Sequence, residues 1–120
     1  MVNDQAKALM FYTEVLGFVK KTDIPVGEYR WLTVISPDGP EGIELVLEPM
    51  GFLPARIYQK ALFDAGIPLT AFQTDDIQKE YKRLKDKKVV FRGKPAKMGT
   101  VTVVLFEDTC GNLISLVQPE

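Results

Sequence analysis

The sequence predicts an α+β fold in which the order helix, strand, strand, strand occurs twice within 120 residues. The clearest signal lies near the end of the chain. There, two apolar runs, Val101–Phe106 and Leu113–Val117, flank a polar turn at Asp108–Asn112, a pattern typical of an antiparallel hairpin. A weaker copy of this pattern lies at Trp31–Leu47. A segment with helical spacing of apolar residues precedes each hairpin, so we expect a duplicated unit.

In the first half we expect a helix at Gln5–Leu16, capped by Asn3–Asp4 and ended by Gly17 in the left-handed conformation. Apolar spacing predicts a buried stripe on this helix, and the aromatic residues beside it are expected to pack in the core. The stripe consists of Ala6, Leu9, Met10 and Val15 or Leu16, and the aromatic residues are Phe11 and Tyr12. Strands are expected at Gly17–Asp23, Arg30–Ser36 and Gly42–Glu48, and a loop at Ile24–Glu28 because it holds Pro25 and Gly27.

A proline-bounded linker, Pro49–Pro54, leads to a short predicted helix at Ala55–Ala65, which ends at Gly66. The second half then repeats the first with a strand, a helix and a hairpin. Its expected elements are a strand at Ile67–Thr74, a helix at Ile77–Lys87 capped by Asp75–Asp76, a short strand at Val89–Phe91, a loop at Arg92–Lys97 and the closing hairpin.

The two halves match with one constant offset when Asp4 is aligned with Asp75, 71 positions later (75 − 4), which also aligns Glu44 with Ser115. Each unit is then βαβββ, and the first strand of the first unit is truncated to residues 1–3. We expect a single domain over residues 1–120, with unit one at 1–48, a linker and short helix at 49–66, and unit two at 67–120. Each helix covers one sheet face, so we expect a curved mixed sheet around a shared cup that suits a ligand.

Composition argues against several function classes. The formal net charge of −1 gives no general attraction to nucleic acid, and no apolar run approaches the roughly 20 residues of a membrane span. A secretory signal is also missing, so we expect a cytoplasmic protein. Basic residues concentrate at Lys79–Lys97, where the solvated face of the predicted helix explains them better than a nucleic-acid site. The chain has no histidine and one cysteine, Cys110, which excludes imidazole metal ligands, histidine-based triads and an intrachain disulfide.

Several motifs resemble the vicinal oxygen chelate superfamily, which includes glyoxalase I, bleomycin-resistance proteins and extradiol dioxygenases. They are Asn3-Asp4, Phe11-Tyr12 followed by Leu16-Gly17-Phe18, Gly42-Ile43-Glu44-Leu45, Thr74-Asp75-Asp76, and the ending Phe106-Glu107-Asp108-Thr109-Cys110-Gly111-Asn112-Leu113-Ile114-Ser115-Leu116. The resemblance implies four metal-ligand positions in the enzymes of the family, on the first and last strands of each unit. Here those positions correspond to the truncated strand, Glu44, a place near Leu69 without a ligand atom, and Ser115. A divalent metal usually needs three or more protein donors, so we expect no metal cofactor.

We therefore favour metal-free binding of a small, partly apolar molecule in the cup. The candidate ligand-binding residues are Trp31, Leu69, Phe72 and Met98 as walls, Arg30 or Arg92 as an anchor, and Ser115 on the last strand. Glu44 is a candidate catalytic acid or base, or a partner for Arg30 or Arg92. Family members that sequester antibiotics need an acidic cleft for cationic drugs, and the near-neutral charge of this chain argues against that version.

Two other functions stay open at this point. One is a metal-dependent lyase, isomerase or dioxygenase of the glyoxalase type, and the other is a non-catalytic protein-interaction module. The unpaired sheet edge left by the truncated first strand predicts a homodimer in either case.

Overall fold

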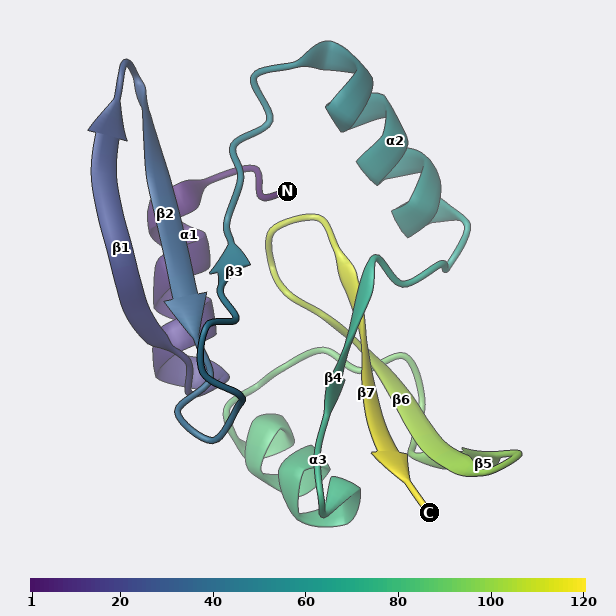
Figure 1. Cartoon of the computed structure of the whole chain (residues 1–120). Coiled ribbons are helices and arrows are strands. Elements are labelled where there is room, and N and C mark those ends of the chain that lie inside the picture. Colours follow the sequence, from purple (N-terminus) through teal and green to yellow (C-terminus); the bar gives the residue numbers. More distant parts are fainter. The chain divides into compact units, whose positions relative to one another are not determined.

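The computed structural model describes all residues, 1–120, and the chain divides into two compact units, Met1–Tyr58 and Gln59–Glu120 (Figure 1). Each unit contains a sheet and a helix in the predicted order, so the α+β fold class is confirmed. A further helix, α2 (Leu53–Asp64), crosses the boundary between the units along the chain. None of the helices is long and apolar enough to cross a membrane. The closure of the two units into a shared cup stays a prediction.

The first unit is a three-stranded antiparallel sheet, in the order β1-β2-β3, with helix α1 packed on one face. Its elements are α1 (Gln5–Met10), the π-helical turn η1 (Phe11–Val15), β1 (Val19–Val26), β2 (Tyr29–Ile35) and β3 (Leu45–Val46). Leu32 and Val34 on β2 are fully buried beneath α1. A single parallel bridge joins Val2 to Pro49, at the place where the first strand of the unit is predicted.

Strand β1 runs through the residues that were predicted to form a loop. Pro25 lies within β1 opposite Arg30, and the chain turns only at Gly27, which has a φ of +59°. Proline has no amide hydrogen to donate, but β1 is the edge strand of its sheet, and an edge strand has one side without a ladder partner. The presence of Pro25 was therefore a wrong reason to end the strand.

The first helix buries a different stripe from the predicted one. Ala8, Phe11 and Tyr12 are buried, whereas Met10 is 59% exposed. The end of this helix is also wider than an α-helix, because the Leu16 amide donates to the Phe11 carbonyl five residues earlier. The predicted core packing of both aromatic residues is confirmed, and Gly17 ends the helix with a φ of +90° as expected.

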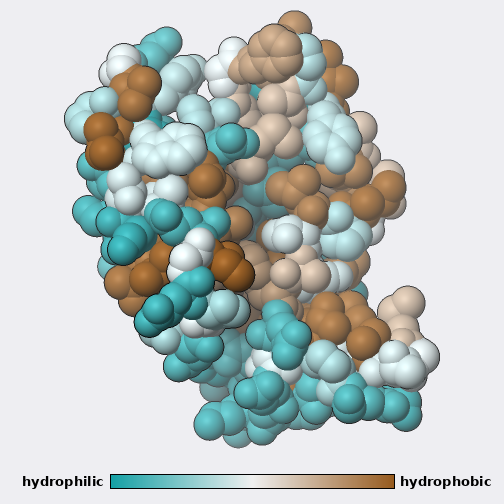
Figure 2. Space-filling model, in the orientation of Figure 1, coloured by the Kyte–Doolittle hydropathy of each residue, from teal (hydrophilic) through white to brown (hydrophobic).

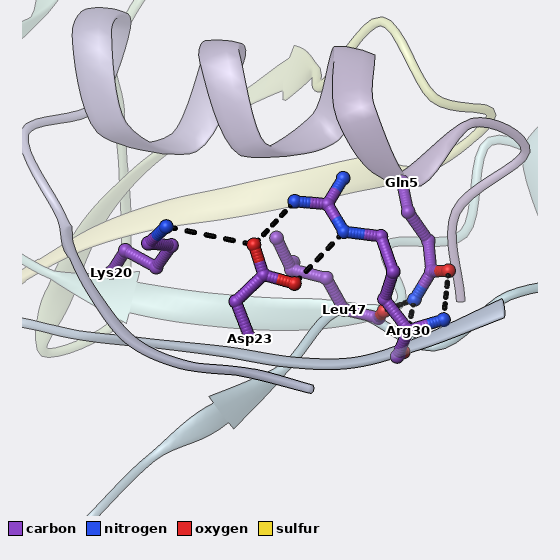
Figure 3. A network of polar contacts seen from close by, with 5 residues as sticks. All are labelled: Gln5, Lys20, Asp23, Arg30 and Leu47. Carbon is purple, nitrogen blue, oxygen red and sulfur yellow. Dashed lines mark hydrogen bonds and ion pairs between the residues drawn. The ribbon is translucent and has the colours of Figure 1, made fainter. Parts of the chain in front are cut away.

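Strand β3 is much shorter than predicted, and at its C-terminal end a side chain replaces part of its ladder. The Gln5 amide group donates to the carbonyls of Arg30 (2.7 Å) and Leu47 (2.9 Å) and accepts from the Arg30 amide (3.0 Å). Figure 3 shows Gln5 reaching from α1 to both segments of the sheet. The Leu47 carbonyl is thus bonded to a helix side chain, so the pairing of β2 with β3 ends early, and the predicted strand at 42–48 keeps only Leu45–Val46.

The second unit is a four-stranded mixed sheet in the order β4-β7-β6-β5, with β4 parallel to β7 and the other pairs antiparallel. Its elements are β4 (Thr70–Gln73), α3 (Ile77–Asp86), β5 (Ala96–Met98), β6 (Val101–Glu107) and β7 (Leu113–Pro119). Helix α3 covers one face with Ile77 and Leu84, both nearly fully buried. The predicted strand at 89–91 is a single bridge from Phe91 to Phe106, and the predicted loop at 92–97 ends in β5.

A fully buried carboxylate organises the turn between β6 and β7. Asp108 accepts hydrogen bonds from the Cys110 amide (2.8 Å), the Asn112 amide (3.0 Å) and the Asn112 side chain (2.8 Å). Gln59 of α2 then donates to the Cys110 carbonyl (3.1 Å) and to the Asn112 side-chain oxygen (3.0 Å). The cysteine is buried in this turn, and every polar group around it has a partner, as buried polar groups require.

The register of the repeat differs from the predicted one. Helix α3 is capped by Asp76, whose carboxylate accepts from the Lys79 amide. In the same way, the carboxylate of Asp4 caps α1 by accepting from the Lys7 amide. The helices are therefore offset by 72 positions (76 − 4). The Val2 amide donates to the Glu48 carbonyl, and in the second unit the Thr74 amide donates to the Val117 carbonyl in the same way. Glu48 is therefore equivalent to Val117, and the last strands are offset by 69 positions (117 − 48). On this basis Ser115 corresponds to Val46, and the predicted match of Ser115 with Glu44 is wrong.

Candidate functional site

Each unit has one sheet face that its own helix does not cover. In the first unit this face, here called the first open face, is the side of the β1-β2-β3 sheet opposite α1. Leu32 and Val34 lie under α1. Because successive strand residues point to opposite faces, Trp31 and Thr33 lie on the first open face. Its exposed members are Ile24 (54%), Val26 (60%), Tyr29 (39%) and Trp31 (50%). Figure 2 shows hydrophobic atoms over the β1-β2 hairpin.

Glu44 reaches the first open face through Thr33. The Thr33 hydroxyl, on a residue that is 1% exposed, donates to Oε1 of Glu44 at 2.7 Å. Glu44 itself is exposed and precedes β3. The alternative that Glu44 pairs with Arg30 or Arg92 is wrong, because both arginines have carboxylate partners within their own units.

Arg30 lies on the helix-covered side of the first sheet. Its Nε and Nη2 atoms donate to the two oxygens of Asp23, at 2.9 and 2.6 Å, and Lys20 lies 3.5 Å from the same carboxylate (Figure 3). Hydrogen bonding to Arg30 holds the pKa of Asp23 below its ordinary value, and the same bond raises the pKa of Arg30. The structure thus places Arg30 away from a ligand on the open face, contrary to its predicted role as an anchor.

The second open face is the side of the β4-β7-β6-β5 sheet opposite α3. The register aligns Ala71, Ser115 and Leu105 in one row and Gln73, Val117 and Val103 in the next, so these two rows are apolar apart from the Ser115 hydroxyl and the Gln73 amide. These six side chains range from half-buried to exposed. Three predicted ligand-binding residues, Leu69, Met98 and Ser115, lie on this face, and Met98 is 65% exposed at its β5 edge.

Arg92 also belongs to the second open face, but a carboxylate already holds it. The Arg92 amide donates to the Leu105 carbonyl, which aligns Arg92 with that row of the sheet. Its Nε donates to Glu107 at 3.1 Å, and its guanidinium carbon lies 5.1 Å from the centre of the Phe63 ring. The charge of Arg92 is therefore largely balanced within the unit.

Phe72, predicted as a wall residue, also lies on a helix-covered face. It pairs with Leu116, which is 5% exposed, whereas its neighbour Ala71 pairs with Ser115 on the open face. Ile24, Val26 and Tyr29 are members of the first open face that were not predicted from the sequence. The alternation that β1 shares with β2 would have revealed all three, but Pro25 and Gly27 had placed Ile24 and Val26 in a predicted loop.

The expectation that this chain binds no metal cofactor stays a prediction. No group of three or more histidine, cysteine, aspartate or glutamate residues is placed to hold an ion. The corrected register removes a further possibility. With the corrected offset of 69, Ser115 in the second unit is equivalent to Val46 in the first. Glu44 in the first unit is equivalent to Leu113 in the second. Neither aliphatic side chain can bind a metal, so each pair of equivalent positions keeps one oxygen donor where three are usual.

Comparisons with known proteins agree with this architecture. A family model described as the glyoxalase/bleomycin resistance protein/dioxygenase superfamily matches residues 1–116. The Bacillus subtilis protein YurT is 56% identical over 117 residues, which cover 98% of this chain and 92% of YurT. The crystal structure of UcmS2 superimposes with a TM-score of 0.82 at 34% identity, covering 97% of this chain and 90% of UcmS2.

A second solved structure carries a functional description. TnmS3, an antibiotic binding protein from Streptomyces sp. CB03234, superimposes with a TM-score of 0.71 at 32% identity. The match covers 99% of this chain and 89% of TnmS3. With the duplicated unit, the open sheet faces and the family match over nearly the whole sequence, this chain belongs to the glyoxalase/bleomycin resistance protein/dioxygenase superfamily.

Proposed function

We propose that this protein binds a small, partly apolar molecule on its open sheet faces and does so without a metal ion. The observation that carries the proposal is the first open face, where four large apolar or aromatic side chains, Ile24, Val26, Tyr29 and Trp31, are each at least 39% exposed. Exposed apolar groups of this size, gathered on one face, are typical of interaction sites. The likeness to the antibiotic binding protein TnmS3 supports a small molecule as the ligand.

The lack of a suitable donor set supports the metal-free form of this proposal over a metal-dependent lyase or dioxygenase. A catalytic role for Glu44 is not needed for binding, since its carboxylate already accepts from Thr33. Dimer formation through the unpaired edge of the first sheet is a separate proposal, and light scattering of the purified protein tests it.

Trp31 is the only tryptophan, so its indole N–H gives one identifiable signal in a ¹⁵N-correlated NMR spectrum. Titration with 2-naphthylmethanol, a neutral aromatic probe, is expected to shift this signal in a saturable way. At about 0.3 kcal/mol per non-hydrogen atom, a probe of this size binds with a Kd on the order of 1 mM. The shift should be the same before and after treatment with EDTA.

A matched pair of variants locates the binding. Ile24→Gln, on the first open face, should weaken the probe several-fold, whereas Met10→Gln, at an equally exposed position on α1, should leave its affinity unchanged. A saturable shift that requires an added divalent metal would instead favour the enzyme alternative. The absence of any saturable shift would contradict the proposal.

A further inference from the structure

Helix α2 presents its apolar side to solvent. A surface helix normally packs its apolar stripe on the core of the protein. In α2 the reverse is found, because Leu53 and Ile57, one turn apart on the same side, are 63% and 62% exposed. The residue that α2 buries is instead the polar Gln59, which is 6% exposed and bonded to the turn between β6 and β7. The apolar side of α2 is therefore free to meet another molecule.

The segment before α2 joins this side of the helix to the first open face. A Cβ atom built on Gly51 would lie 2.7 Å from the hydroxyl oxygen of Tyr29, so the Tyr29 ring packs directly on the backbone of this segment. Phe52 follows at once and is 71% exposed. Hydrophobic atoms accordingly gather over both the β1-β2 hairpin and α2 in Figure 2. The two parts together are here called the apolar surface of the first unit, which consists of Ile24, Val26, Tyr29, Trp31, Phe52, Leu53, Ile57 and Tyr58.

The area of this surface is that of a contact between two proteins. Its eight side chains are each 39% to 71% exposed. Large apolar and aromatic side chains have surfaces of about 150–250 Å², so each exposes about 100 Å² and the eight together expose about 800 Å². The largest apolar patch on a typical monomer is only about 300–600 Å². A stable dimer buries about 800 Å² on each partner, which matches the area found here.

Opposite charges at the two ends make this surface complementary to itself. Glu28 is exposed in the turn of the β1-β2 hairpin, between the last residue of β1 and the first of β2. At the other end Arg56 is exposed on α2, and its Nε atom donates to the Met50 carbonyl at 2.7 Å. A two-fold contact sets each end of a surface against the opposite end of the second copy. It therefore places the acidic end of one copy on the basic end of the other, twice.

We propose that two copies of this chain associate through the apolar surface of the first unit, about a two-fold axis. The contact is made by side chains, unlike pairing along the free edge of the sheet. It covers Ile24 and Trp31, where the small molecule of the proposed function is expected to bind. A ligand at this place and a second copy exclude each other, so the ligand favours the monomer. This last consequence rests on the proposed binding function, whereas the self-association does not.

Sedimentation velocity of the purified chain between about 1 μM and 1 mM tests the self-association. We expect a monomer–dimer equilibrium with a dissociation constant on the order of 1–100 μM. The fluorescence of Trp31, the only tryptophan, should move to shorter wavelength as the dimer forms, because an indole that is 50% exposed becomes buried. Ile57→Gln should raise the dissociation constant at least about tenfold. The matched control is Met10→Gln, which changes a side chain that is 59% exposed on α1 and should leave the dimer intact.

A charge exchange tests the two-fold arrangement. Glu28→Arg places two basic groups at facing ends, and Arg56→Glu places two acidic groups there, so each variant should weaken the dimer about threefold to tenfold. The double variant restores opposite charges and should return the dissociation constant to within about twofold of the wild type. Both positions are exposed, and far-ultraviolet circular dichroism establishes that each variant is folded.

Each outcome bears on a stated part of the proposal. A chain that stays monomeric up to about 1 mM overturns the self-association. A dimer that Ile57→Gln does not weaken uses another surface, such as the sheet edge, and overturns the assignment. A double charge variant as weak as the single ones overturns the two-fold arrangement.

The probe separates this inference from the binding function. Saturating 2-naphthylmethanol should shift the sedimenting species towards the monomer. If the probe shifts the Trp31 NMR signal but leaves the dimer intact, the competition is overturned and the binding function stands. If the probe gives no saturable NMR shift while the variants behave as expected, the binding function fails and the self-association stands.

Discussion

The buried turn at Asp108 gives the sharpest test of what stabilises the second unit. Replacing Asp108 with alanine removes the acceptor for three hydrogen bonds, two of them from the backbone amides of Cys110 and Asn112. Asp108 and Cys110 have no exposed surface, and Asn112 is 4% exposed, so water does not readily replace the lost acceptor. Each buried donor left without a partner costs about 1–3 kcal/mol, so we expect Asp108→Ala to destabilise the protein by about 3–6 kcal/mol.

The isosteric variant Asp108→Asn distinguishes hydrogen-bond direction from shape. Its side-chain oxygen can still accept from both backbone amides, but its new NH₂ group faces the NH₂ group of Asn112, which donates to Asp108 in the native protein. We expect a cost of about 1–3 kcal/mol from this pair of opposed donors. Adding Asn112→Asp supplies an acceptor for the new NH₂ group and for Gln59, which normally donates to Asn112, so the double variant should recover at least about 1 kcal/mol.

Urea unfolding followed by circular dichroism measures these differences as shifts of the midpoint at constant slope. A loss of 3–6 kcal/mol is a large part of the roughly 5–15 kcal/mol that stabilises a typical domain, so Asp108→Ala should be partly unfolded or close to it in water. A midpoint like that of the wild type would refute the assigned role of this carboxylate. Simple additivity of the two substitutions in the double variant would refute the donor-to-donor argument.

Two further predictions concern the first unit. Gln5→Ala should lower the free energy of unfolding by about 1–3 kcal/mol in the same assay, because three hydrogen bonds between α1 and the sheet are lost; a change below 0.5 kcal/mol, about the size expected for a surface substitution, would contradict this role. The pKa of Asp23 is lowered in the folded state by Arg30, so its stabilising effect is present above its ordinary value of 3.8 and is lost as the pH falls through the lower folded value. The difference in melting temperature between wild type and Asp23→Asn should therefore be constant above about pH 5 and shrink towards pH 2, and a difference that grows in acid would reverse the sign of the argument.

The hairpins and the helix termini were predictable because local chemistry specifies them. The turn between Val101–Phe106 and Leu113–Val117 contains the polar residues that form it, and the caps at Asp4 and Asp76 follow from the need to satisfy the first amides of a helix. These signals lie within a few residues of the structure that they determine.

The missed features depend on partners that are distant in the sequence. Strand β3 ends early because Gln5, about 40 residues earlier, bonds to the Leu47 carbonyl. Spacing alone could not show that Ala8 of α1 and Tyr12 of η1 are buried and that Met10 is exposed, because both sets recur at helical intervals. Arg30 is likewise held away from the open face by its hydrogen bond to Asp23. The strand that contains Asp23 was predicted to end at that residue, so the pairing of Asp23 with Arg30 could not be expected.

The sequence predicted that the candidate site lies on sheet faces, but it predicted only some of the residues on those faces. Trp31 lies on the face of its sheet opposite α1, and Leu69, Met98 and Ser115 lie on the face opposite α3, as strand alternation suggests. Arg30 and Phe72 were assigned to those faces without a register that could test them. The role of all these residues in ligand binding stays a prediction.

The unequal offsets of the two halves, 72 for the helices and 69 for the last strands, matter for anyone who builds chimeras from this chain. If the final strand were grafted onto the first half with the 71-residue offset that the sequence alignment suggests, it would be misplaced by two residues. Inward and outward side chains would keep their sides, yet each would land about 7 Å along the strand from its intended neighbours. Backbone hydrogen bonding, not letter similarity, therefore supplies the alignment for recombining such ancient duplicates.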